Sequence, residues 1–398
     1  MASVVLLLIC QVLAMTVWFS STAALPQIVR SEPLSDFRIA AMTSAVQIGF
    51  VVGTLVSAGL RLPDRVDPRA LFLVSAVSAG VLTAGLATVP PAGGLAIGLR
   101  VAAGVCLAGV YPIGLRIAAT WASGDLGWLM GLLVGALTLG SASPHLVLAA
   151  TYGLADWRWV YLVAACAACA SGLLITQIGL GPRQVATPRI ALAAATLAWR
   201  SAPMRLANLG YLGHMWELYA LWAWIGAFFH ASFAAAGTAQ TGSLAGLATF
   251  AVIGAGALGA GLGGICADRV GRTATTMAAM AGSASCALVM GWLFAGPPVL
   301  LIALGIVWGI TVIADSAQFS ASIAELSDPS TVGTMLTIQT SAGFFLTLFS
   351  IQLMGPVVAT FGWPGGFSML AVGPILGCWA MARLRTHPAA RTLAGGLR

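Results

Sequence analysis

Long apolar stretches separated by short polar loops dominate this chain. A helix needs about 20 apolar residues to cross the hydrocarbon core of a bilayer, and twelve stretches of that kind can be placed. We therefore predict twelve transmembrane helices. Six lie in the first half, at about 2–24, 39–60, 70–89, 92–118, 128–152 and 157–180, and six in the second, at about 206–230, 242–266, 273–295, 298–323, 333–357 and 364–384.

The first apolar segment has the length of a signal peptide but not its flanks. It lacks a basic region before the apolar run, and Ala23-Ala24-Leu25 is a weak match to a cleavage site. We interpret it as a retained first helix.

Loop signatures repeat at half the length of the chain. Asp64-Arg65-Val66 recurs 204 residues later as Asp268-Arg269-Val270, and Trp157 is followed by Trp363 206 residues later. Internal repeats are typical of many transporters. The predicted fold is an all-α membrane protein of two pseudo-symmetric six-helix bundles, 1–180 and 206–398, joined by a cytoplasmic linker at 181–205.

Composition excludes a water-soluble domain. The chain is 59% hydrophobic and 7% charged, whereas soluble domains carry roughly 25% charged residues. Thirteen arginines fall in loops on the side of the termini, against Arg30, Arg38 and Arg158 on the opposite side. By the positive-inside rule both termini are expected in the cytoplasm, with the protein in the inner membrane. The net charge of +7 then reports topology, and no soluble domain exists to bind nucleic acid.

No residue pattern for an enzyme is visible. The seven cysteines lie in or at the ends of apolar segments, as small buried hydrophobes do. No metal-ligand cluster, nucleotide loop or nucleophile triad can be found, so we expect no metal, no cofactor and no catalysis. The missing P-loop also excludes ATP as the direct energy source.

Ionisable side chains inside predicted spans ask for an explanation, because burying them in a bilayer costs several kcal/mol. Glu217 lies about 18 Å deeper than Arg205 along its helix, and His214, three residues earlier, shares its face. Asp315 lies deep in the tenth predicted span. We interpret Glu217, Asp315 and His214 as proton-coupling residues. The alternatives are a structural Glu–His pair and a permanent pairing of Asp315 with an arginine.

Aromatic and hydrogen-bonding side chains near these groups form the candidate solute site, since such a cavity fits a small ligand. Arg100 could bind an anion or hold helix packing. Arg116 could extend to the membrane–water interface or attract an anion. The candidate residues are Trp18, Gln47, Arg100, Tyr111, Arg116, Tyr219, Trp222, Trp224, Trp308, Gln318 and Gln339.

The loop from Gly264 to Arg272 reads GICADRVGR and resembles the G-x-x-x-D-R-x-G-R loop of the major facilitator superfamily. Arg100 and Gly104 are similar to that family's R-x-x-x-G signature on the fourth helix. Trp157 and Trp363, which begin the sixth and twelfth predicted spans, are also similar to the family pattern. The resemblance covers the whole chain and implies a twelve-helix secondary transporter, without indicating the substrate.

Two departures from the family pattern are informative. In the first loop copy Gly59 is one residue too far from Asp64, and Asp67-Pro68 replaces the expected glycine. The fifth span lacks the Gly-Pro pair that many drug antiporters carry, which counts against drug efflux.

The two loop copies are candidates for a gate. Asp–Arg pairs at helix ends can bond to neighbouring helix termini and charges. We expect such a cluster to latch the two halves, although it could serve only as a topological anchor. The residues concerned are Asp64, Arg65, Asp268, Arg269 and Arg272.

The sequence thus predicts a proton-coupled secondary transporter of a small solute, with an organic anion among the candidates, working by alternating access. One alternative is a proton-driven efflux antiporter for amphiphilic compounds, and another is a transporter-like sensor. The expected partners are the solute, protons and membrane lipids, the last near Arg200 and Arg205. We expect a monomer.

Overall fold

The computed structural model describes residues 2–122, 126–153, 156–182, 196–328 and 331–397, except for the side chains of Asp64, Leu126 and Gly127. Most of the predicted linker therefore lies outside the described residues. The described part of the chain is helical, without a strand.

The helices follow one another with short connections. In the first half they are α1 Ala2–Met15, α2 Ser20–Ser31, α3 Asp36–Gly59, α4 Leu62–Arg65, α5 Pro68–Gly85, α6 Gly94–Leu107, α7 Tyr111–Trp121, α8 Leu126–Thr151, α9 Arg158–Leu174 and the 3₁₀ turn η1 Ile175–Gln177. In the second half they are α10 Leu197–Arg200, α11 Ala202–Ala235, α12 Thr241–Val270, α13 Arg272–Met290, η3 Gly291–Leu293, α14 Pro298–Ala314, α15 Ser316–Leu326, α16 Val332–Thr386 and η4 Pro388–Gly396.

The membrane spans agree with the twelve that the sequence predicts. Eleven helical stretches of the described chain are long and apolar enough to cross a bilayer. The last of them, α16, has 55 residues, or about 80 Å of helix, against a hydrocarbon core of about 30 Å. At Gly362 its backbone leaves the helical region, with φ 68° and ψ −175°. Glycine tolerates this positive φ, so α16 is two spans joined at a sharp turn.

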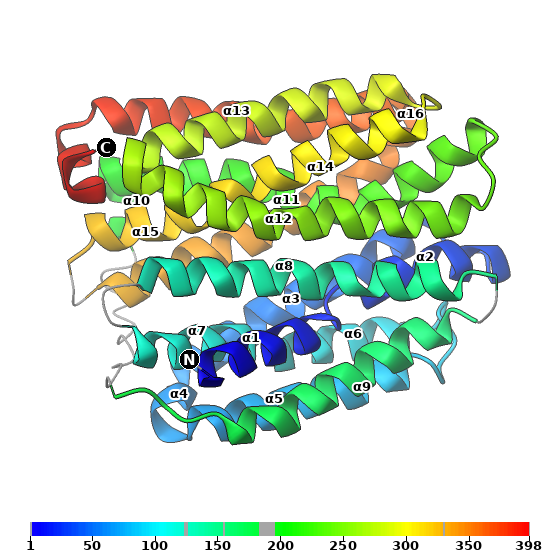
Figure 1. Cartoon of the computed structure of the whole chain (residues 1–398), viewed down its shortest axis with the longest axis horizontal. Coiled ribbons are helices and arrows are strands. Elements are labelled where there is room, and N and C mark those ends of the chain that lie inside the picture. The colour runs from blue at the N-terminus through cyan, green and yellow to red at the C-terminus, as the bar shows by residue number, and fades with distance from the viewer. Residues whose placement is uncertain (1, 123–125, 154–155, 183–195, 329–330, 398) are drawn as a thin grey trace.

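The two halves lie side by side as separate bundles (Figure 1). Helices α1–α9 form one and α10–α16 the other, and α8 packs along α12 and α3 along α16 to join them. Both chain ends lie at the same end of the molecule, here named the terminus end. The opposite end is named the far end.

Three predicted spans are interrupted, which the sequence did not indicate. The first span breaks at residues 16–19 between α1 and α2, and the fourth at residues 108–110 between α6 and α7. The tenth breaks at Asp315 between α14 and α15. The second and third breaks lie about 206 residues apart, which is the offset of the repeated loop signatures. The halves therefore share an interruption as well as a sequence echo.

Glycines let pairs of spans touch backbone to backbone. A Cβ on Gly49 would lie 1.9 Å from the Val101 carbonyl oxygen, where α3 crosses α6. A Cβ on Gly259 would lie 2.1 Å from the Ile310 oxygen, where α12 crosses α14. Small residues permit such close approach in membranes. The same kind of crossing thus fixes the second and fourth spans in one half and the eighth and tenth in the other.

We predict that Gly259→Ala destabilises the fold, because the added methyl group must push α14 away from α12. Overpacking of this kind typically costs about 1–3 kcal/mol, which thermal unfolding in detergent would show as a lower Tm. Gly261→Ala is the matched control, since a Cβ there has no atom within 4 Å and alanine favours helix. Equal Tm values for the two variants would contradict the packing argument.

Candidate functional site

Arg100 holds the interrupted first span in place. Its guanidinium is fully buried and donates to the carbonyl oxygens of Val17 at 2.9 Å and Trp18 at 2.6 Å. Further bonds reach the Met42 oxygen at 3.2 Å and Ser20 Oγ at 3.4 Å. The carbonyls that follow α1 carry the negative end of its dipole, so a cation is favourable there. Four protein acceptors occupy Arg100, and this geometry suits positioning better than binding an anion.

The break places Trp18 in a group of rings that joins the two halves. Its members, which we name the central aromatic cluster, are Trp18, Phe19, Phe50, Tyr219, Trp222 and Phe344. Trp18 lies 5.0 Å from Phe50 and 5.9 Å from Tyr219 between ring centroids. Phe344 of α16 lies 4.8 Å from Phe50 and 5.0 Å from Tyr219. All six rings are buried. The cluster therefore closes the middle of the interface between the bundles.

Two donors within this cluster are left over. The indole Nε1 atoms of Trp18 and Trp222 are buried and have no hydrogen-bond partner among the described residues. An unsatisfied buried donor costs about 1–3 kcal/mol, so native structures rarely keep one without a water or ligand partner.

The opposite face of α11 carries Glu217 and His214, which meet the tenth span. Glu217 Oε1 accepts a 2.7 Å hydrogen bond from Trp308 Nε1 of α14. His214 Nδ1 lies 2.9 Å from Asp315 Oδ1, an ion-pair contact without hydrogen-bond alignment, since that oxygen lacks a hydrogen bond within the described structure. All four side chains are at most 2% exposed. The sequence placed His214 beside Glu217, whereas the fold pairs each with a different residue of the tenth span.

Asp315 stands at the interruption of that span. Its backbone, at φ −93° and ψ −16°, ends α14, and its carbonyl accepts from Gln318 N at 2.9 Å to begin α15. A break beside a buried acid gives the acid a place to move without distorting a full helix, and broken helices form the ion sites of many transporters.

A polar cluster continues from Gln318 toward the terminus end. Arg272 NH1 donates to Gln318 Oε1 at 2.8 Å, and its Nε donates to both Glu325 oxygens at 2.9 Å. Glu325 also accepts from Ala394 N of η4 at 3.0 Å. These residues all belong to the second half. The contacts of Arg272 therefore tie α13, α15 and η4 together rather than one bundle to the other.

The other loop residues predicted to form a gate, where their side chains are described, are more exposed than Arg272. Asp268, Arg269 and Arg65 are exposed, and the side chain of Asp64 lies outside the described residues. Next to Asp64, Asp67 caps α5 and accepts from the Arg69 side chain at 2.8 Å. That hydrogen bond holds the pKa of the Asp67 carboxyl below its usual value.

Several predicted solute residues have structural partners instead. Trp224 Nε1 donates to the Ile351 oxygen at 3.1 Å, and Gln339 Nε2 to Asn208 Oδ1 at 3.2 Å. With its amide turned to satisfy its neighbours, Gln47 donates within its own helix to the Thr43 oxygen at 2.7 Å. Tyr111 and Arg116 are half-buried on α7.

Sequence reasoning did not single out the phenylalanines of the central aromatic cluster, Phe19, Phe50 and Phe344. A lone phenylalanine in an apolar span is an ordinary packing residue, so no signal distinguishes these three. Their role is visible only once the bundles are assembled.

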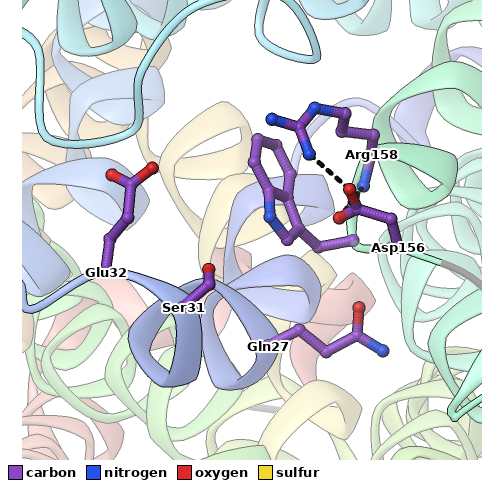
Figure 2. Close-up of a pocket in the computed structure, with 6 residues that line it drawn as sticks. Gln27, Ser31, Glu32, Asp156 and Arg158 are labelled. Atoms are coloured by element: carbon purple, nitrogen blue, oxygen red, sulfur yellow. Dashed lines mark hydrogen bonds and ion pairs between the residues drawn. The ribbon is translucent and has the colours of Figure 1, made fainter.

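A separate surface pocket of about 370 Å³ opens at the far end between α2 and the start of α9 (Figure 2). Gln27, Ser31 and Glu32 line one side, and Asp156 and Arg158 the other. Arg158 pairs with Asp156 and lies 4.4 Å above the Trp157 ring. The pocket is distinct from the central aromatic cluster, and its cation is already neutralised.

Comparisons with known proteins agree with this architecture. The family model described as Major Facilitator Superfamily matches residues 7–244. Among solved structures, a crystal structure of a D-xylose–proton symporter superposes with a TM-score of 0.74 over 97% of this chain and 98% of that one. At 15% sequence identity that likeness concerns the fold alone.

A search of curated proteins found no match. The family match spans more than half of the chain, and the repeated halves, the interrupted spans and the membrane-length helices are those of a transporter. The chain belongs to the Major Facilitator Superfamily and is a membrane transporter.

Proposed function

We propose that the protein is a proton-coupled secondary transporter that moves a small solute by alternating access. The observation that carries the proposal is the pair of buried acids, Glu217 and Asp315, held by Trp308 and His214 at a broken span. A carboxylate is costly inside a membrane, and a bound proton removes its charge. Binding and release of a proton therefore change what holds α11 to the tenth span.

Helix α11 connects the acids with the solute region. His214 and Glu217 contact the tenth span, while Tyr219 and Trp222 contact rings of the first half. A shift of α11 on protonation would move Tyr219 and Trp222 and so change the packing of the central aromatic cluster. We place the solute between these rings, where the two bundles must part.

The choice among solutes follows from the same contacts. Of the two roles open to Arg100, binding an organic anion or holding helix packing, the contacts favour packing, because that guanidinium already has four protein acceptors. The aromatic cluster favours the second candidate function, efflux of amphiphilic compounds in exchange for protons. With the terminus end in the cytoplasm, as the arginine distribution indicates, the same machinery can serve either direction.

Glu217→Gln should abolish proton-driven accumulation while leaving solute counterflow intact. The amide keeps an oxygen for Trp308 Nε1 but cannot bind and release a proton. The measurement is uptake into proteoliposomes with and without an imposed pH gradient. Accumulation in the variant that still follows the pH gradient would sink the assignment.

Asp315 offers a graded test of the second acid. Asp315→Asn retains an oxygen opposite His214 and should uncouple transport with little change in Tm. Asp315→Ala also removes the contact, and we expect it to lose about 1–3 kcal/mol of stability, measured as a lower Tm. If Asp315→Asn folds and still couples transport to the pH gradient, Asp315 is not part of the proton path.

Contacts across the halves close the far end. Arg30 NH2 of α2 lies 2.8 Å from His230 Nε2 of α11, and Tyr152 packs against both side chains. Nearby, Gln352 of α16 donates to Ser44 Oγ of α3 at 3.1 Å. Since neutral imidazole accepts a hydrogen bond and imidazolium cannot, acidification should replace the Arg30–His230 bond with repulsion between two cations.

We predict that the far end opens as the pH falls through the titration of His230. A cysteine at Ser44, in a background without native cysteines, should react faster with an impermeant maleimide at pH 4.5 than at pH 8. The maleimide rates are first corrected for the pH dependence of thiol reactivity, using a cysteine at the exposed residue Phe361.

His230→Gln is the matched control, because glutamine retains an acceptor but does not titrate. The corrected labelling rate should then be the same at both pH values. A pH response that survives in His230→Gln would show that another group opens the far end.

A further inference from the structure

The central aromatic cluster offers donors that nothing in the described structure accepts. Trp18 Nε1 belongs to the first half and Trp222 Nε1 to the second, and both tryptophans contact Tyr219, at 5.9 Å and 5.6 Å between ring centroids. An indole N–H donates and cannot accept. A ligand that satisfies these two groups must therefore bring hydrogen-bond acceptors.

Charge narrows the class of ligand. Arg100, the cation that touches this region, donates to backbone and hydroxyl oxygens. Glu217 of α11 and Asp315 of the tenth span make their contacts on another face of α11, with Trp308 and His214. An anion bound between the rings would have no counter-charge in these contacts, and an isolated buried charge is strongly disfavoured. An ammonium ion would bring donors where the cluster already has two, and a cation without donors would leave both indole N–H groups unsatisfied. An uncharged ligand fits best.

The rings themselves define the shape of the ligand. Neighbouring members meet at tilted angles, 59° for Trp18 with Phe50, 53° for Phe50 with Phe344 and 55° for Tyr219 with Phe344. The contact of Phe50 with Phe344 crosses from α3 to α16, and Trp18 and Phe19 of the first span contact Tyr219 and Trp222 of α11. Movement of the bundles therefore separates the rings into facing aromatic walls. A flat ring between such walls can make offset stacking contacts on both faces.

From these observations we infer that the transported solute is an uncharged planar ring compound with hydrogen-bond acceptors, bound between the rings and accepting from Trp18 Nε1 and Trp222 Nε1. The inference rests on the proposed function for the location of the solute and adds its chemical class. Sugars, organic cations and organic anions are the competing classes.

Binding to the purified full-length protein tests the class directly. Coumarin, nicotinamide and caffeine are the neutral planar probes, and tetraphenylphosphonium, benzoate and xylose represent the competitors. Equilibrium dialysis should show saturable binding of at least one neutral planar probe and weaker binding of the others. Failure of all three planar probes, or tighter binding of a competitor, would overturn the inference.

Substitutions locate the bound probe. Trp18→Phe and Trp222→Phe keep a ring and remove the donor, so each should weaken binding of the planar probe about five- to tenfold. Each variant also removes part of a buried ring and leaves a cavity, so each should have a lower Tm without ligand, and binding is compared at a temperature where all variants are folded. Trp292→Phe, at a residue that is 74% exposed, is the control and should bind as the native protein does. Unchanged affinity in both cluster variants would refute the assignment.

Transport separates this inference from the proposed function. A planar probe that binds through the two indoles but is not moved by a pH gradient would refute proton-coupled transport and leave the binding class standing. Proton-driven uptake of xylose without binding of any planar probe would refute the ligand class and leave proton-coupled transport standing.

Discussion

Backbone polar groups inside a bilayer find no water, so every interruption of a spanning helix must be satisfied by the protein itself. The core of this molecule depends on how that requirement is met at residues 16–19. Arg100 supplies donors to the carbonyls of Val17 and Trp18, and these oxygens in turn make a fully buried guanidinium tolerable. Neither partner could stay in the membrane without the other. Their bond fixes the first span against α3 and α6 and sets Trp18 at the interface of the bundles.

Helix α11 connects the buried acidic groups with the central aromatic cluster. One face has Glu217 and His214, which contact Trp308 and Asp315 of the tenth span, and the other has the rings that meet the first half. A helix transmits a small rotation along its whole length, because its backbone hydrogen bonds are all internal. The tenth span, in contrast, is interrupted at Asp315. The proposed coupling therefore needs no long chain of contacts, because one helix lies between the acid-bearing break and the aromatic interface.

The sequence was informative where the membrane dictates the length of a span or makes a buried charge costly. Apolar run length predicts twelve spans, and the scarcity of acids draws attention to Glu217 and Asp315. The interruption at 16–19 could not be predicted, because Val17, Trp18 and Phe19 are as apolar as the residues around them. Helical spacing placed His214 next to Glu217, but spacing says nothing of the facing helix, which supplies Trp308 and Asp315 as their partners. Phe50 and Phe344 gain their place only from the assembly of two bundles.

The matched breaks at residues 108–110 and at Asp315 show how a duplicated unit can diverge. Both copies keep the interruption of the corresponding span, yet in one it holds glycine and valine, and in the other an aspartate. The buried cation, Arg100, lies on the same span in the first copy, where the second copy has apolar residues and glycine. The span of the first break thus carries a positive charge that holds backbone carbonyls, whereas the second break carries a buried carboxyl group, so the two halves place opposite charges on corresponding spans.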